Sequence, residues 1–114
     1  MFAWGYLVRE GFKILEKNYR TKLGEMDVIA EKSKRIYFIE VKTRSTADKG
    51  FPEESVTKLK QRRIARLALS YLQKNKRLEN AAAFGVISIL WQPPREPELR
   101  WFENAFVLDD SYFA

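Results

Sequence analysis

The sequence predicts an α/β fold in which helices pack on a mixed central sheet, because strand and helix patterns alternate along its 114 residues. Two strands are predicted over residues 25–31 and 35–43, where the alternation of side chains has period two. A long helix follows, since apolar residues recur at helical spacing between residues 56 and 72. The continuous apolar run at 83–91 is typical of a strand covered on both faces. The expected order is helix, three strands, helix and one or two strands, or α-β-β-β-α-β-β.

The N-terminal part begins with a predicted short helix over residues 2–10, whose apolar residues share one helical face. Gly11 follows it as a natural helix stop. Residues 12–19 predict a strand that runs into a polar loop at 18–22. Only residues 32–34 lie between the two central strands, which suits a hairpin. The hairpin places those two strands side by side.

The C-terminal part begins with a loop at 45–54, whose length is typical of a lid or contact arm. The long helix is predicted from Ser55, whose hydroxyl can cap it, to residues 78–80. Its apolar stripe consists of Val56, Leu59, Ile64, Leu67, Ala68, Tyr71 and Leu72. The remaining predicted elements are a strand at 83–91, a proline-containing loop at 92–98, a short strand at 99–103, a turn beginning at 104–106 and a tail at 109–114. No second domain is indicated, so residues 1–114 are expected to form one domain.

The composition restricts the chemistry that the protein can perform. Cysteine and histidine are both absent, which excludes disulfides, thiol nucleophiles, histidine bases and the usual zinc ligands. Any catalysis must therefore use carboxylates and lysine. A metal would have to accept oxygen ligands, so Mg²⁺ or Mn²⁺ is favoured over zinc.

The charge of the chain suits a polyanionic partner. Its 21 basic and 15 acidic residues give a net charge of +6. Nucleic acid is the leading expectation, with DNA favoured over RNA, although many small proteins are basic for no specific reason. No apolar run is as long as a membrane span, and residues 1–4 lack the pattern of a signal peptide. A cytoplasmic protein without membrane contact is expected.

The predicted hairpin gathers three charged residues. Side chains alternate along a strand, so Glu40 and Lys42 share one face of their strand with Phe38. The neighbouring strand brings Asp27 toward Glu40 on that face. One interpretation is a functional cluster. The alternative is a ladder of solvated ion pairs, joined by Arg44, that contributes at most about 1 kcal/mol for each pair.

The long helix carries an unusually basic surface. Its cations near the start are Lys58, Lys60, Arg62, Arg63 and Arg66. Clustered cations can neutralise consecutive phosphates, so we favour nucleic-acid contact over a merely solvated face. Basic residues at the other end, at 74–77, are weaker evidence, because the helix dipole also favours them there. Tryptophans at 4, 91 and 101 suit either base stacking or the core. Trp101 and Phe102, expected on a short edge strand, are the candidates for an interface and a homodimer.

Three runs carry a family resemblance: Gly24-Glu25-Met26-Asp27, Phe38-Ile39-Glu40-Val41-Lys42-Thr43-Arg44, and Lys60-Gln61 with Tyr71-Leu72. Flanking positions agree, namely Ala3, Tyr6, Leu7, Gly11, Asn18, Arg20 and Asn104-Ala105-Phe106. The chain resembles the YraN (UPF0102) family, an uncharacterised bacterial group. That group is similar in fold to the restriction-endonuclease-like PD-(D/E)XK nucleases, which include archaeal Holliday-junction resolvases. The resemblance covers most of the chain.

The resemblance implies a role for each residue of the cluster. Asp27 matches the first acidic residue of the nuclease signature, and Glu40 with Lys42 matches its E-x-K element. Asp27, Glu40 and the carbonyl of Val41 would then hold Mg²⁺ or Mn²⁺. Lys42 would either orient or deprotonate the attacking water, or stabilise the transition state as a cation.

Other polar residues near the cluster each have more than one interpretation. Glu25 either holds a group beside the metal ligands, pairs with Arg20 or Lys22, or caps the sheet edge. Lys60 and Gln61 either reach the site from the helix or form a solvated first turn. Two acids of the family pattern are absent, one ahead of Ala3 and one at Gly85. Without these two acids, the protein is either a nuclease that tolerates their loss, a nuclease that acts with fewer ligands, or a protein that keeps the fold for binding alone.

Three functions follow from these features. The first is a metal-dependent nuclease that acts on branched, single-stranded or otherwise unusual DNA or RNA. The second is a nucleic-acid-binding module of the same fold without turnover. The third, a structural or protein-interaction module, requires that Arg62, Arg63 and Arg66 contribute nothing to nucleic-acid affinity.

Overall fold

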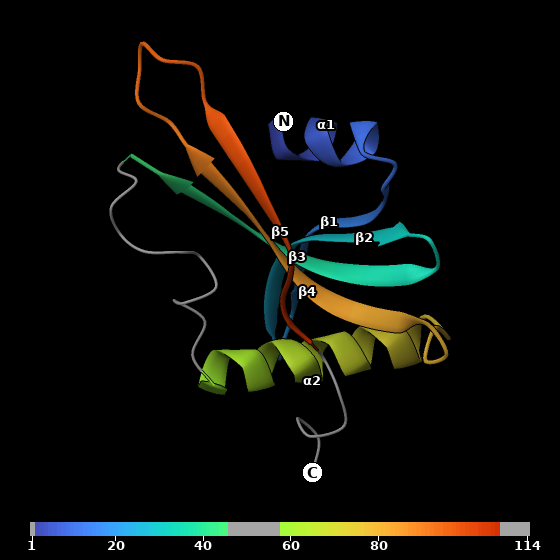
Figure 1. Ribbon diagram of the computed structural model, residues 1–114. Helices are drawn as coiled ribbons and strands as arrows, with labels where there is room; N and C mark the ends of the chain where they lie inside the picture. Colours follow the sequence, from blue (N-terminus) through green and yellow to red (C-terminus); the bar gives the residue numbers. More distant parts are fainter. Residues whose placement is uncertain (1, 46–57, 108–114) are drawn as a thin grey trace.

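A computed structural model describes residues 2–45 and 58–107, in which two helices and five strands are formed (Figure 1). The elements are α1 (Phe2–Arg9), β1 (Lys13–Thr21), β2 (Gly24–Lys32), β3 (Arg35–Arg44), α2 (Lys58–Lys74), β4 (Ala81–Leu90) and β5 (Glu98–Val107). This order is the predicted α-β-β-β-α-β-β. Residues 46–54 of the predicted loop, the helix start at Ser55 and the tail at 109–114 lie outside the described residues.

The five strands form one mixed sheet in the order β1-β2-β3-β4-β5. β3 and β4 are parallel, and the other neighbouring pairs are antiparallel. Parallel neighbours need a crossover, and the segment that contains α2 provides it. β4 lies between β3 and β5, which explains why residues 83–87 are all buried. The mixed sheet between helices agrees with the restriction-endonuclease-like architecture that the resemblance implied.

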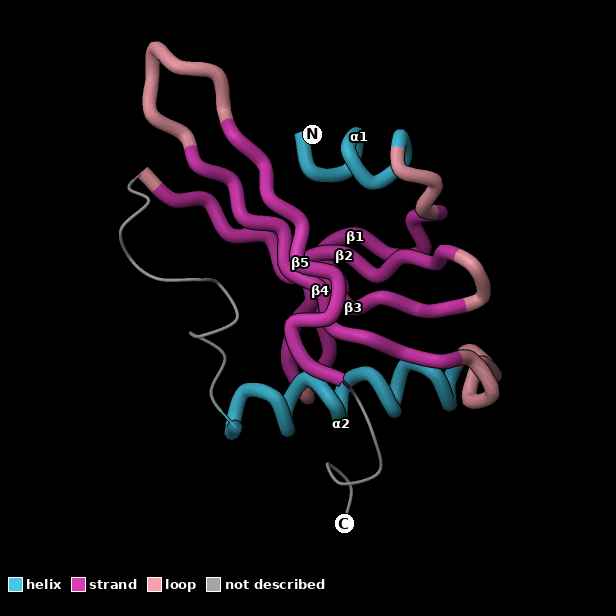
Figure 2. Tube along the Cα trace, viewed as in Figure 1, coloured by secondary structure: helices cyan, strands magenta, loops and turns pink. Residues whose placement is uncertain are grey.

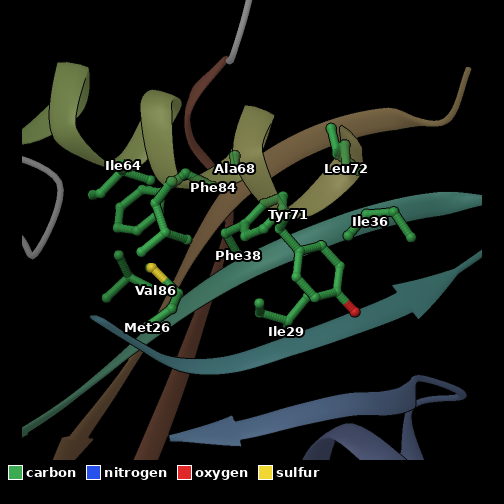
Figure 3. Close-up of a cluster of buried hydrophobic side chains, with 11 residues drawn as sticks. Met26, Ile29, Ile36, Phe38, Ile64, Ala68, Tyr71, Leu72, Phe84 and Val86 are labelled. Atoms are coloured by element: carbon green, nitrogen blue, oxygen red, sulfur yellow. The ribbon is translucent and has the colours of Figure 1, made fainter. Parts of the chain in front are cut away.

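The two helices cover opposite faces of the sheet (Figure 1). The larger core lies beneath α2, where Phe38, Tyr71 and Phe84 are its largest side chains (Figure 3). The smaller core lies beneath α1 and includes Leu7 and Ile39. Alternation along β3 thus sends Phe38 to the α2 face and Ile39 to the α1 face, as predicted. Glu40 consequently belongs to the α2 face.

Local backbone chemistry fixes the predicted ends of α1 and of the central hairpin. Gly11 has a φ of 92°, and the N–H of Phe12 donates to the carbonyl of Leu7, which closes α1. The hairpin between β2 and β3 has a loop of only two residues, Ser33 and Lys34, both with positive φ. Two positive φ values are typical of the type I′ turn, whose twist matches that of paired strands.

The prediction that α2 continues to residues 78–80 was wrong, because the helix ends at Lys74. The N–H of Arg77 donates to the carbonyl of Leu72 at 2.7 Å, and Lys76 has a φ of 57°. This is the Schellman arrangement that terminates helices. Glycine usually occupies the residue with left-handed backbone conformation at a helix end, so a lysine at position 76 does not predict this helix end from the sequence.

Two strand boundaries also differ from the prediction. β1 continues to Thr21, and only two residues separate it from β2, so the predicted polar loop at 18–22 is mostly strand. β5 extends from Glu98 to Val107, so residues 104–106 are strand and not the predicted turn. Both strands pair along a neighbour through backbone groups, which do not depend on side-chain polarity.

Trp101 and Phe102 are not the exposed pair that the sequence suggested. The Trp101 ring packs edge-on against Phe12 at 5.6 Å between centroids and belongs to the α1 core. Phe102 packs against the α2 core on the other face of β5. Contacts within the chain therefore half-bury both side chains, and the interface expected at this pair stays a prediction. A homodimer stays a prediction.

Beyond the helices, the end of β4, the start of β5 and the loop between them form an extension (Figure 2). The end of β3 accompanies them, since the N–H of Trp91 donates to the carbonyl of Arg44 at 2.9 Å. Across the described ranges 2–45 and 58–107, no helix has the length and apolar character needed to cross a membrane.

Candidate functional site

The candidate site lies where β2 and β3 separate. Their register ends at the pair Val28 and Ile39, one residue from Asp27 on β2. Beyond that pair the N–H of Val41 donates to Oδ2 of Asp27 at 2.7 Å. The carboxylate thus takes the hydrogen bond that a strand carbonyl would otherwise accept, and this bond fixes its position beside β3.

Glu40 lies next to Asp27 and is only partly satisfied. Its Oε1 accepts a hydrogen bond from Nζ of Lys60 at 2.8 Å, so α2 contributes a cation to the site. Its Oε2 is buried, and none of the described residues donates a hydrogen bond to it. A buried carboxylate oxygen without a donor is costly unless a further cation or water satisfies it. The arrangement therefore favours binding of a cation.

A small pocket of about 90 Å³ joins these groups, with Asp27, Glu40 and Lys60 in its lining. Burial raises the pKa of Asp27 above its usual value. The hydrogen bond from the Val41 N–H lowers the pKa of Asp27. The charges of Glu40 and Glu25 raise this pKa further, and the charge of Lys60 lowers it. Two carboxylates that repel each other in a half-buried pocket create a negative potential suited to a metal ion.

Lys42 completes the predicted cluster on the same face of β3. It is half-buried, two residues beyond Glu40, and pairs in register with Ser88 of β4. Burial lowers the pKa of Lys42; Glu40 opposes this shift, while the charges of Lys60 and Arg44 reinforce it. A lysine with a lowered pKa gives up its proton more readily than an exposed one.

The carboxylate pair fits magnesium or manganese. In the part of the chain that the structure describes, no three residues among Asp, Glu, His and Cys gather into a metal-binding group. Mg²⁺ commonly uses one or two protein carboxylates and completes its shell with waters and substrate phosphates. Asp27 with the unsatisfied Oε2 of Glu40 matches that donor set. The Val41 carbonyl as a ligand stays a prediction.

Glu25 forms the predicted pair with Arg20, at 3.3 Å across β1 and β2. Both side chains are largely exposed, so this pair contributes little to stability. Glu25 also lines the pocket that contains Asp27 and Glu40. Its charge is therefore close enough to act on the carboxylate pair, although Glu25 is largely exposed, whereas Asp27 and Glu40 are partly buried.

The predicted nucleic-acid-binding residues fall into two groups. Lys58, Arg62, Arg63 and Arg66 are exposed on α2. Lys60, by contrast, faces Glu40, while Gln61 and Arg44 are partly buried. At the other end of α2, Arg77 pairs with Glu31 at 2.9 Å, which gives this cation a structural role. The exposed group is thus concentrated near the start of the described helix.

Gly85 lies on the face opposite the carboxylate pair. It pairs with Ile39 of the α1 face, and a Cβ on Gly85 would collide with the ring of Trp101. The acid that the family pattern has at this position would therefore point away from Asp27 and Glu40. Its absence makes room for Trp101 and removes nothing from the carboxylate pair.

Sequence reasoning missed the surface next to the site. Leu59 was expected in the apolar stripe of α2, but its side chain is 57% exposed. Leu23, in the tight turn between β1 and β2, is 46% exposed. Both line a second pocket beside the carboxylates. A leucine in an otherwise polar turn was the available signal.

Similar proteins extend over almost the whole chain. A UPF0102 protein of Geobacter metallireducens is 44% identical over 103 residues, which cover 90% of this chain and 84% of that protein. A UPF0102 protein of Lachnoclostridium phytofermentans is 42% identical over 111 residues, covering 96% and 87% respectively. Among solved structures, Pyrococcus furiosus SfsA in complex with Ca²⁺ has a TM-score of 0.41 and 15% identity, and the match covers 89% of this chain and 58% of that one. The family model of uncharacterised protein family UPF0102 matches residues 1–89, and the chain belongs to that family.

Proposed function

We propose that this protein binds nucleic acid and hydrolyses its phosphodiester bonds with a divalent metal held by Asp27 and Glu40. The buried Oε2 of Glu40, which has no hydrogen-bond donor among the described residues, is the observation that carries the proposal. Glu40 lines a pocket with Asp27 and Lys60, and Lys60 belongs to the helix that carries the exposed cations. DNA is the favoured substrate, and RNA has the same phosphate chemistry.

Each residue has a distinct task in this proposal. Asp27 and Glu40 hold the ion, and the Val41 N–H keeps the Asp27 carboxylate oriented. A bound Mg²⁺ or Mn²⁺ supplies a water of lowered pKa and offsets charge on the phosphate. Lys42 either accepts the proton of the attacking water or stabilises the added negative charge. Arg62, Arg63 and Arg66 attract and align the phosphate backbone.

Lys60 gives the site a cation of its own. Its ammonium and a metal ion compete for Oε1 of Glu40, because both seek the same anionic oxygen. This observation favours a second candidate function, a nucleic-acid-binding module in which Lys60 takes the place of the metal and no cleavage occurs. Under both functions the exposed cations of α2 contact phosphates.

The test combines a cleavage assay with a binding assay. Wild type and Lys42→Ala are incubated with Mg²⁺ or Mn²⁺ on duplex, single-stranded and four-way-junction substrates. We expect Lys42→Ala to reduce cleavage by about 10² to 10⁴, the range for loss of a general acid or base, with binding retained. Lys13→Ala, at an exposed cation of β1 outside the proposed binding surface, is the matched control.

The outcomes separate the candidate functions. Salt-sensitive binding by wild type without cleavage of any substrate would favour the non-catalytic module. Absence of both binding and cleavage would exclude nucleic acid as the ligand. Cleavage that persists fully in Asp27→Asn and Glu40→Gln would exclude the proposed metal site.

A further inference from the structure

A second and larger pocket opens beside the carboxylate pair. Its volume is about 380 Å³, and it lies between the turn joining β1 to β2 and the first turns of α2. The lining residues are Leu23, Gly24, Glu25, Leu59, Lys60, Arg63, Ile64 and Leu67. Glu25, Lys60 and Ile64 also line the pocket of Asp27 and Glu40, so the two pockets adjoin.

The lining of this larger pocket combines apolar and cationic groups. Leu23 and Leu59 are among the few large apolar side chains that the described residues leave exposed. Leu23 comes from the turn between β1 and β2 and Leu59 comes from α2, and both line the pocket. Lys60 and Arg63 add two cations to the same lining, and Glu25 adds one carboxylate. Glu25 pairs with Arg20 and Lys60 pairs with Glu40, so Arg63 is the cation that remains to attract an anion. The complementary ligand has an apolar face and a negative charge.

We propose that this pocket receives the base of an unpaired nucleotide whose phosphate lies toward the carboxylate pair. The inference rests on the proposed function and adds a substrate class to it. A nucleotide offers an apolar base beside an anionic phosphate, which matches Leu23 and Leu59 beside Arg63. The volume is at the lower end of the range of about 300 to 1,000 Å³ for small-ligand sites.

The pocket also distinguishes between nucleic-acid forms. Bases inside a duplex are stacked and paired, so reaching a pocket requires the base to unstack and unpair, which costs free energy. A base in a single strand, a flap or a branch point is already accessible. The substrate is therefore a nucleic acid with unpaired nucleotides, and fully paired duplex interacts only through its phosphates with the exposed cations of α2.

Binding measurements on two equally exposed leucines test the inference. Leu59→Ser removes an apolar wall of the pocket, whereas Leu78→Ser, at a residue 56% exposed beyond the end of α2, is the control. Fluorescence anisotropy in EDTA measures affinity for a short single strand, the same strand with abasic positions, and a duplex. EDTA prevents turnover, so the readout does not depend on cleavage.

We expect Leu59→Ser to weaken single-strand binding by about fivefold, because a half-exposed leucine loses part of its burial energy. Duplex binding and abasic-strand binding should be unchanged, and Leu78→Ser should alter none of the three. Leu23→Ser should reproduce the effect from the opposite wall.

Several results would overturn the inference. Equal weakening for single strand and duplex, or no weakening, would show that no base enters the pocket. A fall in unfolding temperature or a change in oligomeric state, with unchanged affinity, would show that the protein itself or a second copy covers Leu59. If wild type binds with salt dependence and Leu59→Ser has no effect, only the base pocket fails. If wild type binds no nucleic acid, the proposed function fails with it.

Discussion

The ammonium of Lys60 on α2 donates a hydrogen bond of 2.8 Å to Oε1 of Glu40 on β3. The two residues are 20 positions apart, and their contact joins the helix layer to the sheet at the candidate site. Because Glu40 is also a proposed metal ligand, the contact ties metal binding to the position of a helix side chain.

Replacing Lys60 should strengthen metal binding. Lys60→Met removes the cation that competes for Glu40 Oε1, while it keeps a long apolar side chain in the pocket. We expect Mn²⁺ to bind about fivefold more tightly, since a partly exposed ion pair contributes about 1 kcal/mol. Isothermal titration calorimetry measures the affinity, with Lys58→Met as control. Weaker binding would indicate that Lys60 supports the site and does not compete for it.

The stability of the metal-free protein should respond to pH through Asp27. Its pKa is raised in the folded state, chiefly by burial, so folding disfavours the ionised carboxyl. Stability contributed by Asp27 is therefore lost as pH rises from the unfolded pKa, about 4, toward the folded pKa. Asp27→Asn removes this ionisation.

Thermal unfolding in EDTA measures this effect. The unfolding temperature of Asp27→Asn relative to wild type should increase over that acidic range and then stay constant. Glu98→Gln, on an exposed residue of β5, controls for a change in net charge. A difference that decreases as pH rises would mean that folding favours the ionised Asp27.

The exposed arginines of α2 should determine the salt dependence of binding. A triple variant should bind with a weaker dependence on salt when Gln replaces Arg62, Arg63 and Arg66. The slope of log affinity against log salt should fall in magnitude by about 0.7 for each single-strand phosphate contact that is lost. The control triple changes Lys13, Lys74 and Lys76, which are equally exposed elsewhere. Equal reductions by both triples would mean that only net charge matters.

Restoring an acid at position 85 should damage the protein without improving its site. Gly85→Asp places a side chain in the space of the Trp101 ring and a charge on the apolar α1 face. Overpacking and an unpaired buried charge together should cost about 3 kcal/mol or more in the free energy of unfolding.

Urea denaturation measures the stability, and Mn²⁺ calorimetry measures the site. The double variant Gly85→Asp, Trp101→Ala tests whether the ring is the obstacle, since removing it should recover part of the overpacking cost. Tighter Mn²⁺ binding in Gly85→Asp would contradict the assignment of residue 85 to the far face.

The sequence by itself determined the strand faces, because alternation is a local property of extended backbone. It correctly placed Glu40 on the face with Phe38, and Gly11 at the end of α1. The absence of cysteine and histidine likewise excluded thiol and imidazole chemistry. These conclusions need no knowledge of how elements pack.

Tertiary structure decided what surrounds those residues. The bond from Val41 to Asp27 forms only because β2 and β3 separate after Val28, and strand separation depends on the whole sheet. Lys60 reaches Glu40, and Leu59 remains exposed, because of where α2 crosses that sheet. Helical periodicity gives the relative directions of side chains on one helix, but the packing partner decides which of them are buried. The carboxylate pair was therefore predictable from the sequence, whereas its lysine partner and the adjoining pocket follow from how α2 packs on the sheet.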